Sequence, residues 1–490
     1  MYIVMVASEC APVAKVGGLA DVVFGLSREL EIRGNAVEII LPKYDCMRYD
    51  HIWGMQVAWK HLAVPWGGGG IDCTVWFGFV HGRKCFFIEP HCREGFFERG
   101  AFYGFSDEAD RFAFFTKAAL EFMLKSDKRP DIIHTHDWQT ALLPVLLYEV
   151  YAHAGMPHQR VCHTIHNFKH QGVAGSHLLW AAGLLDPGKY MSGDRLGDDF
   201  DPNTANFTKG AIAYSNFVTT VSPHHAWEAR HSDQGHGLGH ALFMYQDKFR
   251  GVLNGIDYEM WNPEIDRLIA HPFTAAGFEF KRPNTVGLRH RLMLQESEKP
   301  VIAYVGRLDP QKGLHLIRHA LFHCIHNGAQ FVLLGSGSEH AINHDFHQLK
   351  YHLNENPDCH LEIGYNEELA HLVYAGADFV IVPSAFEPCG LTQMIAMRYG
   401  TVPVVRSVGG LRDTVFDWDH SDRPRSERNG FLFEHLDARG IESALDRALG
   451  LWHGNRAAFE ELATNCMACD YSWNHPGREY VSIYEHIRHK

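Results

Sequence analysis

Short apolar runs with the composition of buried parallel strands alternate with helical patterns along the 490-residue chain. Strands that alternate with helices form βαβ units, which join into parallel sheets covered by helices on both faces. The pattern therefore predicts an α/β fold. We expect strands in two series, near residues 2–7, 36–41, 85–88, 131–135, 160–165 and 217–221, and near 301–306, 330–334, 360–363, 379–383 and 402–405.

The two series of strands indicate two domains, since a chain of this length exceeds what a single hydrophobic core usually serves. An irregular segment begins at Trp261-Asn262-Pro263, directly after the first series. We place the boundary there. The prediction is a Rossmann-like domain over residues 1–260, a second over 261–474, and a C-terminal helix over 475–490.

Composition narrows the class of protein. Hydrophobic residues make up 46% of the chain and charged residues 21%, which is typical of a globular protein with substantial cores. The net charge of −13 argues against a nucleic-acid partner, because such proteins usually carry a basic stripe. No run of 18 apolar residues is found, so no membrane partner is expected.

The cysteines and histidines predict neither a disulfide framework nor a required metal. The 11 cysteines are scattered, and only Cys466 and Cys469 form a Cys-x-x-Cys pair, which favours a reducing compartment. With no signal peptide before the first strand, we expect a cytoplasmic protein, or a stromal one if a transit peptide was removed. The 35 histidines include no His-Glu-x-x-His motif, so most are expected to be exposed or structural.

The segment Ser384 to Leu391 is the first candidate site. It follows the apolar run 379–383, so Glu387 is expected just past the carboxyl end of a strand, where open α/β sheets bind ligands. Gly390 permits close approach of a backbone, and a helical pattern begins right after it. A carboxylate beside an anion pocket suggests chemistry on an activated phosphate ester. A solvated glutamate in a connecting loop is the simpler alternative.

Two further loops have the same character. Lys15-Val16-Gly17-Gly18-Leu19 connects the first strand to a helix and reads as a phosphate or sugar cradle with Lys15 at its edge. Arg307 and Lys312 lie in Gly-Arg-Leu-Asp-Pro-Gln-Lys-Gly after the strand at 301–306. Arginine offers a planar fork and lysine a mobile point charge, a combination that suits a diphosphate.

Together these motifs resemble the glycogen and starch synthases, in particular the cyanobacterial enzymes and related plant starch synthases. The resemblance runs from Met1 to about Tyr484, and its motifs follow the family's order. They are the Lys-Val-Gly-Gly-Leu loop, His134 to Trp138, His166-Asn167, Val252 to Asp257, Gly306-Arg307 with Lys312-Gly313, Ser384 to Leu391, and Gly409-Gly410-Leu411.

The resemblance implies a GT-B fold, in which two Rossmann-like doubly wound domains face each other across a cleft and the last helix crosses back to the first domain. It implies retaining transfer of glucose from ADP-glucose to the non-reducing end of an α-1,4-glucan, with no cofactor besides the donor substrate. The first domain would bind the glucan and the second ADP-glucose.

The resemblance also assigns roles to residues of this chain. Those expected to take part in the reaction are Glu387, Arg307, Lys312, Lys15, His166 and Asp137. Those expected to bind the nucleotide sugar are Lys15, Gly17, Gly18, Arg307, Lys312, Tyr365, Gly390, Leu391 and Thr392. One position departs from the pattern: Val408 stands where the family commonly has threonine, so a side-chain hydrogen bond is lost there.

The sequence leaves three alternatives to a glycogen or starch synthase. A glucan-binding or priming factor with the same fold would turn over poorly. A phosphorolytic enzyme of the glycogen phosphorylase type would need pyridoxal phosphate and a much longer chain. A sucrose-synthase-like enzyme with a UDP donor is the nearest of the three.

Overall fold

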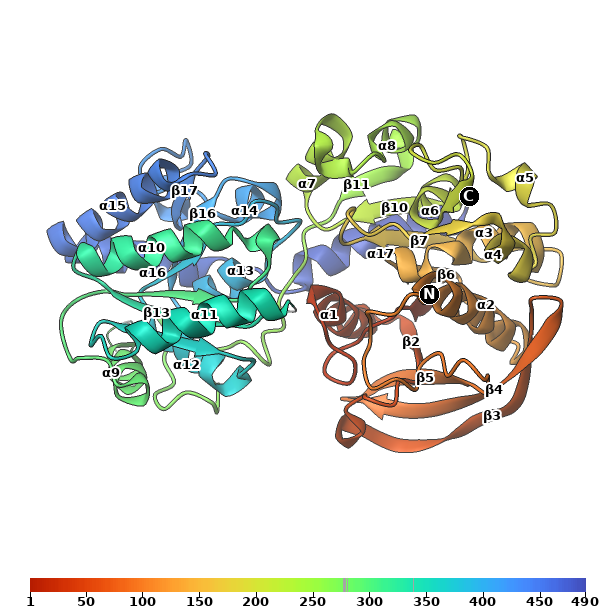
Figure 1. Cartoon of the computed structure of the whole chain (residues 1–490), viewed down its shortest axis with the longest axis horizontal. Coiled ribbons are helices and arrows are strands. Elements are labelled where there is room, and N and C mark those ends of the chain that lie inside the picture. The colour runs from red at the N-terminus through yellow and green to blue at the C-terminus, as the bar shows by residue number, and fades with distance from the viewer. Residues whose placement is uncertain (276–278, 280, 338) are drawn as a thin grey trace. The chain divides into compact units, whose positions relative to one another are not determined.

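The computed structural model describes residues 1–275, 279, 281–337 and 339–490, which form two compact units (Figure 1). The first unit comprises Met1–Gly255 together with Trp473–Lys490, and the second comprises Ile256–Ser472. The division after Gly255 lies five residues before the boundary expected from the sequence, near residue 260. Each unit is built around its own largely parallel sheet.

The first unit contains a nine-stranded sheet in the order β11-β10-β7-β6-β1-β2-β5-β4-β3. Strand β1 lies in its middle, where Val4 pairs with Glu38 of β2 on one side and with Ile133 of β6 on the other. The parallel strands are β1 (Tyr2–Val6), β2 (Ala36–Pro42), β5 (Arg83–Pro90), β6 (Ile132–His136), β7 (Arg160–Ile165), β10 (Phe217–Thr220) and β11 (Phe249–Gly251).

An antiparallel extension of this sheet was not expected. Strands β3 (Ile52–Trp66) and β4 (Gly69–Val80) form a long hairpin beside β5. Gly67 and Gly68 make the hairpin turn with positive φ, and Gly69 and Gly70 belong to β4. Strand β3 is mostly exposed, so it lacks the continuous apolar run that marks a buried strand. A small antiparallel pair, β8 (Val173–Gly175) and β9 (Thr204–Asn206), lies outside the sheet.

The second unit has a six-stranded parallel sheet in the order β14-β13-β12-β15-β16-β17. Numbered within the unit this is 3-2-1-4-5-6, the order of a Rossmann fold, and the topological switch point lies between β12 and β15. The strands are β12 (Val301–Val305), β13 (Gln330–Gly335), β14 (Cys359–Ile363), β15 (Phe379–Val382), β16 (Val402–Arg406) and β17 (Phe431–Phe433). All eleven strands expected from the sequence are present within two residues at either end.

Helices cover the sheets of both units (Figure 1). In the first unit they are α1 (Gly18–Ile32), α2 (Glu108–Lys125), α3 (Leu142–Leu146), α4 (Ser176–Ala181), α5 (Pro187–Tyr190), α6 (Phe207–Tyr214), α7 (Pro223–His231), α8 (Gly239–Met244) and α17 (Asn474–Arg488). In the second they are α9 (Lys281–Leu292), α10 (Leu314–His326), α11 (His340–Leu353), α12 (Glu367–Gly376), α13 (Thr392–Arg398), α14 (Gly409–Thr414), α15 (Ala438–Gly454) and α16 (Arg456–Ala468).

The last helix, α17, packs in the first unit although it is separated from the rest of that unit by more than two hundred residues. Its buried face carries Tyr480, Ile483, Tyr484 and Ile487, which are spaced three or four residues apart and so share one side of the helix. The Tyr484 hydroxyl lies 2.7 Å from Nδ1 of His134 on β6. Helix α17 is therefore part of the hydrophobic core of the first unit.

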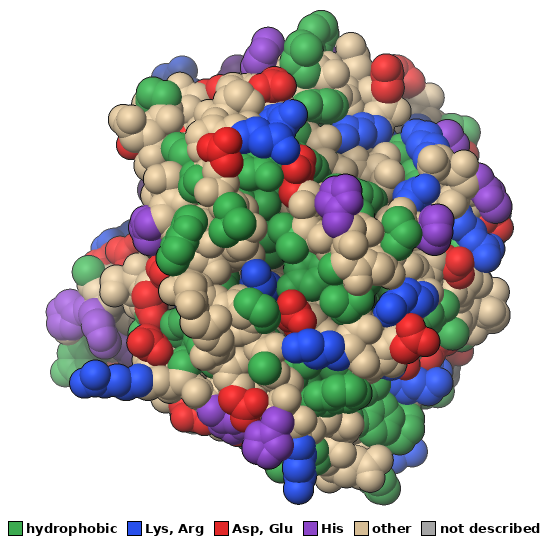
Figure 2. All heavy atoms as spheres, turned by 90° about the vertical axis from the view of Figure 1, so that its right-hand side faces the viewer, with side chains coloured by type: hydrophobic (Ala, Val, Ile, Leu, Met, Phe, Trp, Pro, Cys, Tyr) green, Lys and Arg blue, Asp and Glu red, His purple; other side chains and the backbone are tan. Residues whose placement is uncertain are grey.

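Surface charge is mixed. On the face drawn in Figure 2, basic and acidic side chains are interspersed among apolar and other polar groups. None of the helices in the described part of the chain has the length and apolar character needed to cross a membrane.

Candidate active site

In the second unit the candidate carboxylate Glu387 lies past the carboxyl end of β15, as the sequence predicted. Its side chain is 6% exposed. Oε2 accepts hydrogen bonds from the Lys312 ammonium at 2.5 Å and from the Ser384 hydroxyl at 2.8 Å. A carboxylate with a cationic and a neutral donor on one oxygen is held in place by its partners.

Lys312 reaches Glu387 because the loop after β12 folds tightly against the end of β15. Gly313 has a φ of 72°, and a Cβ on it would lie 2.2 Å from the carbonyl oxygen of Pro383. The Ala385 N–H donates to the carbonyl of Gln311 at 2.9 Å, which ties the two loops together. The sequence analysis assigned Lys312 to a diphosphate, and in this structure its ammonium is bound to the carboxylate.

Arg307 lies in the same loop, and its side chain is more exposed than that of Lys312. Its side chain is 56% exposed, and Nη1 is 4.0 Å from Oδ2 of Asp309. The Tyr304 hydroxyl donates to the Arg307 carbonyl at 2.6 Å and fixes the backbone at this point. The guanidinium is therefore accessible for an anionic ligand.

Backbone groups after Glu387 form a tight turn into α13. Gly390 has a φ of 75°, a conformation that glycine adopts readily, and Leu391 and Thr392 begin the helix. The Thr392 hydroxyl donates to the Val305 carbonyl at the end of β12 at 3.4 Å. The turn packs directly on α14, since a Cβ on Gly409 would lie 1.9 Å from the Glu387 carbonyl oxygen.

Two other predicted positions sit near this edge of the sheet. Tyr365 follows β14 and is 76% exposed, with its hydroxyl 3.1 Å from Oε2 of Glu367. Val408 is buried directly before α14, and its N–H donates to the Arg406 carbonyl at 2.9 Å. An exposed ring at a strand end is available for stacking, whereas the valine contributes only packing.

In the first unit, the Lys15–Gly18 loop is organised by Glu9, a residue that the sequence analysis missed. Glu9 is 6% exposed, and its Oε2 accepts from the Val16 and Gly17 N–H groups at 2.7 and 3.0 Å. Burial raises the pKa of the Glu9 carboxyl, although these N–H groups lower it. Lys15 pairs with Asp21 at 2.7 Å. The position of Glu9, just past the end of β1, was the signal that could have identified it.

Asp137 and His166 follow the neighbouring strands β6 and β7, and the structure brings them together. Oδ1 of Asp137 accepts from the N–H groups of His166 at 2.6 Å and Asn167 at 3.3 Å. Burial raises the pKa of the Asp137 carboxyl to about 7. Its backbone has φ 56° and ψ −179°, a region that is nearly restricted to glycine, and such strain concentrates at functional sites.

A group of buried histidines lies next to Asp137 and His166 in the first unit. Nε2 of His166 lies 3.1 Å from Nδ1 of His136, and the ring of His136 packs on His134 with centroids 4.1 Å apart. Burial lowers the pKa of His166 to about 3 and that of His136 well below its ordinary value. His163 is equally buried and hydrogen-bonds Thr135 Oγ1 at 2.8 Å. The imidazoles are therefore neutral near pH 7 and offer polar contacts without charge.

A pocket of about 530 Å³ opens beside Asp137 in the same unit. Trp138 lines it, and Gly172 has a φ of 66° and packs against the indole, where a Cβ would come within 2.6 Å. Phe200, which is 79% exposed, and Gln171 lie on the pocket wall. Charged and polar side chains, among them Glu108, Lys169 and Asp198, line much of the rest, so the pocket combines aromatic surface with hydrogen-bonding groups that suit a polar ligand such as a sugar.

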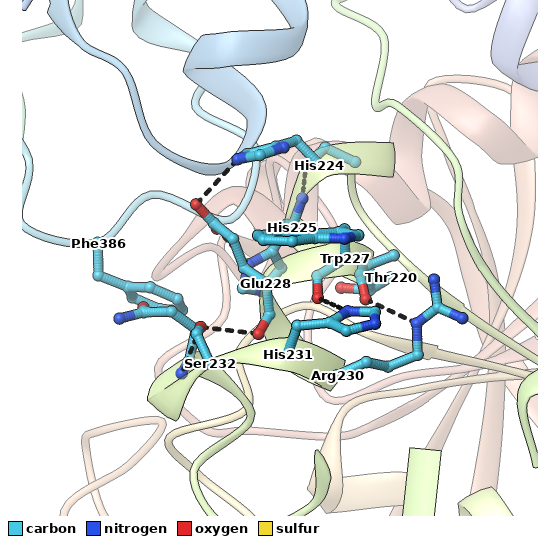
Figure 3. A network of polar contacts seen from close by, with 12 residues as sticks. Thr220, His224, His225, Trp227, Glu228, Arg230, His231, Ser232 and Phe386 are labelled. Atoms are coloured by element: carbon cyan, nitrogen blue, oxygen red, sulfur yellow. Dashed lines mark hydrogen bonds and ion pairs between the residues drawn. The ribbon is translucent and has the colours of Figure 1, made fainter. Parts of the chain in front are cut away.

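Helix α7 follows the next strand, β10, and is shown in Figure 3. The Trp227 ring is stacked between His224 and His231, with centroids 5.6 and 5.0 Å away. Glu228 pairs with His224 at 3.3 Å, and the Ser232 hydroxyl donates to the Glu228 carbonyl at 2.8 Å. These histidines are engaged within the helix, so both faces of the indole are already covered.

The chain matches two families over most of its length. Residues 2–243 match the starch synthase catalytic domain, and residues 291–465 match the glycosyl transferases of group 1. Glycogen synthase 1 of Trichormus variabilis is 60% identical, with both chains covered in full. Glycogen synthase 2 of Methylococcus capsulatus is 62% identical over 99% of this chain and all of the relative. The chain belongs to the glycogen and starch synthase family.

Solved structures agree with this assignment. The catalytic domain of Starch Synthase IV from Arabidopsis thaliana, bound to ADP and acarbose, superposes with a TM-score of 0.97 at 43% identity and covers 100% of this chain. Sucrose-phosphate synthase from Thermosynechococcus elongatus, at 18% identity and a TM-score of 0.63, shares the fold. The expected GT-B class and the glycogen or starch synthase activity are therefore confirmed, and this family member is a glycosyltransferase.

Proposed function

We propose that this protein transfers glucose from ADP-glucose to the 4-hydroxyl at the non-reducing end of an α-1,4-glucan, with retention of the α configuration. The observation that carries the proposal is the buried Glu387 bound by Lys312 at the carboxyl end of β15. Support for the adenine nucleotide comes from the Starch Synthase IV match, which was solved with ADP.

In this proposal the second unit binds the donor. The transition state places negative charge on the departing diphosphate and positive charge on the sugar. Arg307 and Lys312 stabilise the diphosphate, and the loss of one such preorganised contact typically costs about 10²- to 10³-fold in rate. Glu387 faces the sugar, while the backbone of Gly390 and Leu391 receives phosphate oxygens.

Three more groups complete the donor contacts. The Thr392 hydroxyl is proposed to turn from the Val305 carbonyl to a phosphate oxygen, a small change because their present distance is a long 3.4 Å. The exposed ring of Tyr365 is proposed to stack on the adenine. The loop from Lys15 to Gly18, preorganised by Glu9, is proposed as a further phosphate contact.

The first unit is proposed to bind the glucan. The pocket lined by Trp138 offers aromatic surface for sugar rings, and Asp137 and His166 lie at the adjoining strand ends. With its pKa lowered by burial, His166 is neutral and contacts sugar hydroxyls as a hydrogen-bonding group and not as an acid. The proposal therefore keeps the roles that the resemblance implies: the first domain binds the glucan and the second binds ADP-glucose.

A donor comparison tests the proposal. With maltooligosaccharides as acceptors, kcat/KM for ADP-glucose should exceed that for UDP-glucose by at least about tenfold, which corresponds to ~1.4 kcal/mol. The measurement is the initial rate of nucleoside diphosphate release with each donor. Equal rates would favour the UDP alternative, and binding of glucan without release from either donor would favour a glucan-binding factor.

A further inference from the structure

Two helices of the second unit bring four metal-ligating side chains together away from the donor site. Helices α10 and α15 lie side by side (Figure 1). His319 and His323 are one turn apart on α10, and Glu442 and Asp446 are one turn apart on α15. Residues at this spacing lie on the same face of a helix. We call these four residues the α10–α15 cluster.

The contacts pair each histidine with a carboxylate. Nε2 of His319 lies 2.7 Å from Oε1 of Glu442, and Nε2 of His323 lies 2.7 Å from Oδ1 of Asp446. An ionised carboxylate only accepts hydrogen bonds, so the bond to Asp446 requires the N–H of His323 at Nε2. In its neutral form His323 then presents an unprotonated Nδ1.

That free nitrogen faces the carboxylate of Glu442. Nδ1 of His323 is 3.7 Å from Oε1 of Glu442, which is too long for a hydrogen bond. His319, His323 and Glu442 each offer one ligand atom, and these atoms lie within 4.8 Å of one another. No other group of three such side chains is found in the described part of the chain.

We propose that His319, His323 and Glu442 bind one divalent transition metal ion of the zinc class, and that Asp446 positions His323. Tetrahedral zinc with bonds of about 2.0–2.1 Å separates its ligand atoms by roughly 3.4 Å. The 3.7 Å separation of His323 and Glu442 is close to this value. The 2.7 Å contact of His319 has to lengthen by a fraction of an ångström when the ion replaces its proton.

The hydrogen bond from His323 to Asp446 distinguishes a metal site from a chance contact between the two helices. A histidine that binds a metal usually donates its other N–H to a carboxylate, which fixes the ring and the tautomer. His323 already makes that bond and is only 15% exposed, whereas His319 and Glu442 are 37% and 36% exposed and reachable by an ion. Water completes the coordination.

The ligand set selects the class of ion. Imidazole nitrogens favour zinc, nickel and copper, whereas magnesium and calcium take oxygen ligands. The ion would link α10, which begins two residues after Lys312, to a helix more than a hundred residues later in the chain. It stabilises the second unit and takes no part in glucosyl transfer.

The sequence analysis expected no required metal and did not single out the spacing of His319 and His323. The carboxylates come from a separate helix, so the fold is needed to see the site. The proposal leaves the reaction without a metal requirement, and it assigns the ion a structural role.

Zinc binding to the full chain tests the proposal. Titration calorimetry should give one Zn²⁺ per chain at this site, and the melting temperature of the second unit should rise by roughly 5–10 °C at a hundredfold excess over Kd. Co²⁺ should give visible d–d bands without the near-ultraviolet absorption of thiolate ligands, which separates the site from the cysteines. Mg²⁺ should have no effect.

Variants of the proposed ligands test whether the ion binds at the α10–α15 cluster. His319→Ala with His323→Ala should abolish the Co²⁺ bands and the zinc-dependent shift. Asp446→Asn should weaken zinc binding by about 10- to 100-fold while leaving the melting temperature without metal unchanged. The matched control is His340→Ala with His344→Ala, an exposed pair at the same spacing on α11, which should keep full binding.

The proposal is overturned by either of two results. One is absence of zinc binding to the wild-type chain at 0.1 mM, on the order of a hundred times the Kd of a micromolar site. The other is binding that survives the loss of His319 and His323 but not of His340 and His344. Turnover of ADP-glucose without zinc serves as the folding check and should be the same in all variants.

Discussion

At the scale of single residues, Glu387 is tightly constrained in the candidate site. It is a buried carboxylate whose Oε2 is shared by an ammonium and a hydroxyl. Charge-assisted hydrogen bonds of this kind are shorter and stronger than neutral ones. The carboxylate of Glu387 is therefore held in position where the sugar is proposed to bind.

Replacing this charge should affect catalysis more than nucleotide binding. Glu387→Gln is nearly isosteric but neutral, and we expect kcat to fall by at least about 10²-fold with nucleotide affinity within a few-fold of wild type. Ser384→Ala is the control, because it removes one neutral hydrogen bond of about 1 kcal/mol and should cost less than tenfold. Steady-state ADP release measures both. A Glu387→Gln enzyme with near-normal kcat would remove this residue from the reaction.

Arg307 and Lys312 are expected to act on one diphosphate. If they do, their losses are coupled, and the double alanine variant should lose less kcat/KM than the sum of the two single losses. Arg307→Lys should also be impaired, since an ammonium cannot form the bidentate fork. The measurement is kcat/KM for ADP-glucose in the wild type, the two single alanine variants, the double variant and Arg307→Lys, with thermal melting as a check of folding. Additive losses, or a fully active Arg307→Lys enzyme, would show that the two cations act separately.

The sequence identified most of these residues because strand ends can be read from apolar runs. Glu387, Asp137 and His166 each follow a run that became a strand. The pairing of Lys312 with Glu387 was not predictable, since the two are 75 positions apart and their contact depends on Gly313 packing against Pro383.

At the scale of elements, the longer parallel strands were predicted, whereas the hairpin strands β3 and β4 and the three-residue strands β8, β9, β11 and β17 were not. Strand β3 is exposed or half-buried at every position except Leu62 and Val64 and contains Pro65, so it gave no strand signal although it spans Ile52–Trp66. The C-terminal helix α17 was predicted over residues 475–490, but the domain on which it packs was known only from the resemblance. In the structure it packs on α1, where the indole of Trp473 lies against Gly25.

This packing predicts opposite effects of one substitution at two helical glycines. In Gly25→Ala the new Cβ would lie 2.0 Å from Nε1 of Trp473, so the end of α17 must shift, and overpacking of this kind typically costs about 1–3 kcal/mol. In Gly450→Ala, within α15, nothing lies within 4 Å of the new Cβ, and the higher helix propensity of alanine should stabilise by about 0.5–1 kcal/mol. Denaturant unfolding measures both changes. Stabilisation by Gly25→Ala would mean that Trp473 is not held against α1.

At the scale of the whole molecule, each unit has its own sheet, and the first one contains a set of buried histidines. His134, His136 and His163 are completely buried, and burial lowers their pKa values. Unfolding exposes them to water, where their pKa returns to about 6.5 and they bind protons below that pH. The first unit therefore contains histidines that bind protons when acid unfolds it, which the sequence could not predict because it does not show which histidines are enclosed.

His163 allows this sensitivity to be measured. Its folded pKa of about 3 is below the unfolded value, so its contribution to stability is present above about pH 6.5 and is lost as the pH falls toward 3. His163→Gln keeps a partner for the Thr135 hydroxyl but cannot be protonated. The difference in unfolding free energy between wild type and variant should change by about 1.4 kcal/mol per pH unit between roughly pH 6 and 4.

The comparison with the variant isolates this one group from others that titrate in the same range. Asp137, with its pKa raised to about 7, works in the opposite direction, and its contribution is the same in both proteins and cancels. Urea unfolding of the first unit at several pH values gives the free energy of unfolding as a function of pH for the wild type and for His163→Gln. Parallel curves from pH 6 to 4 would show that His163 is already protonated in the folded protein, or that its pKa is not lowered by burial.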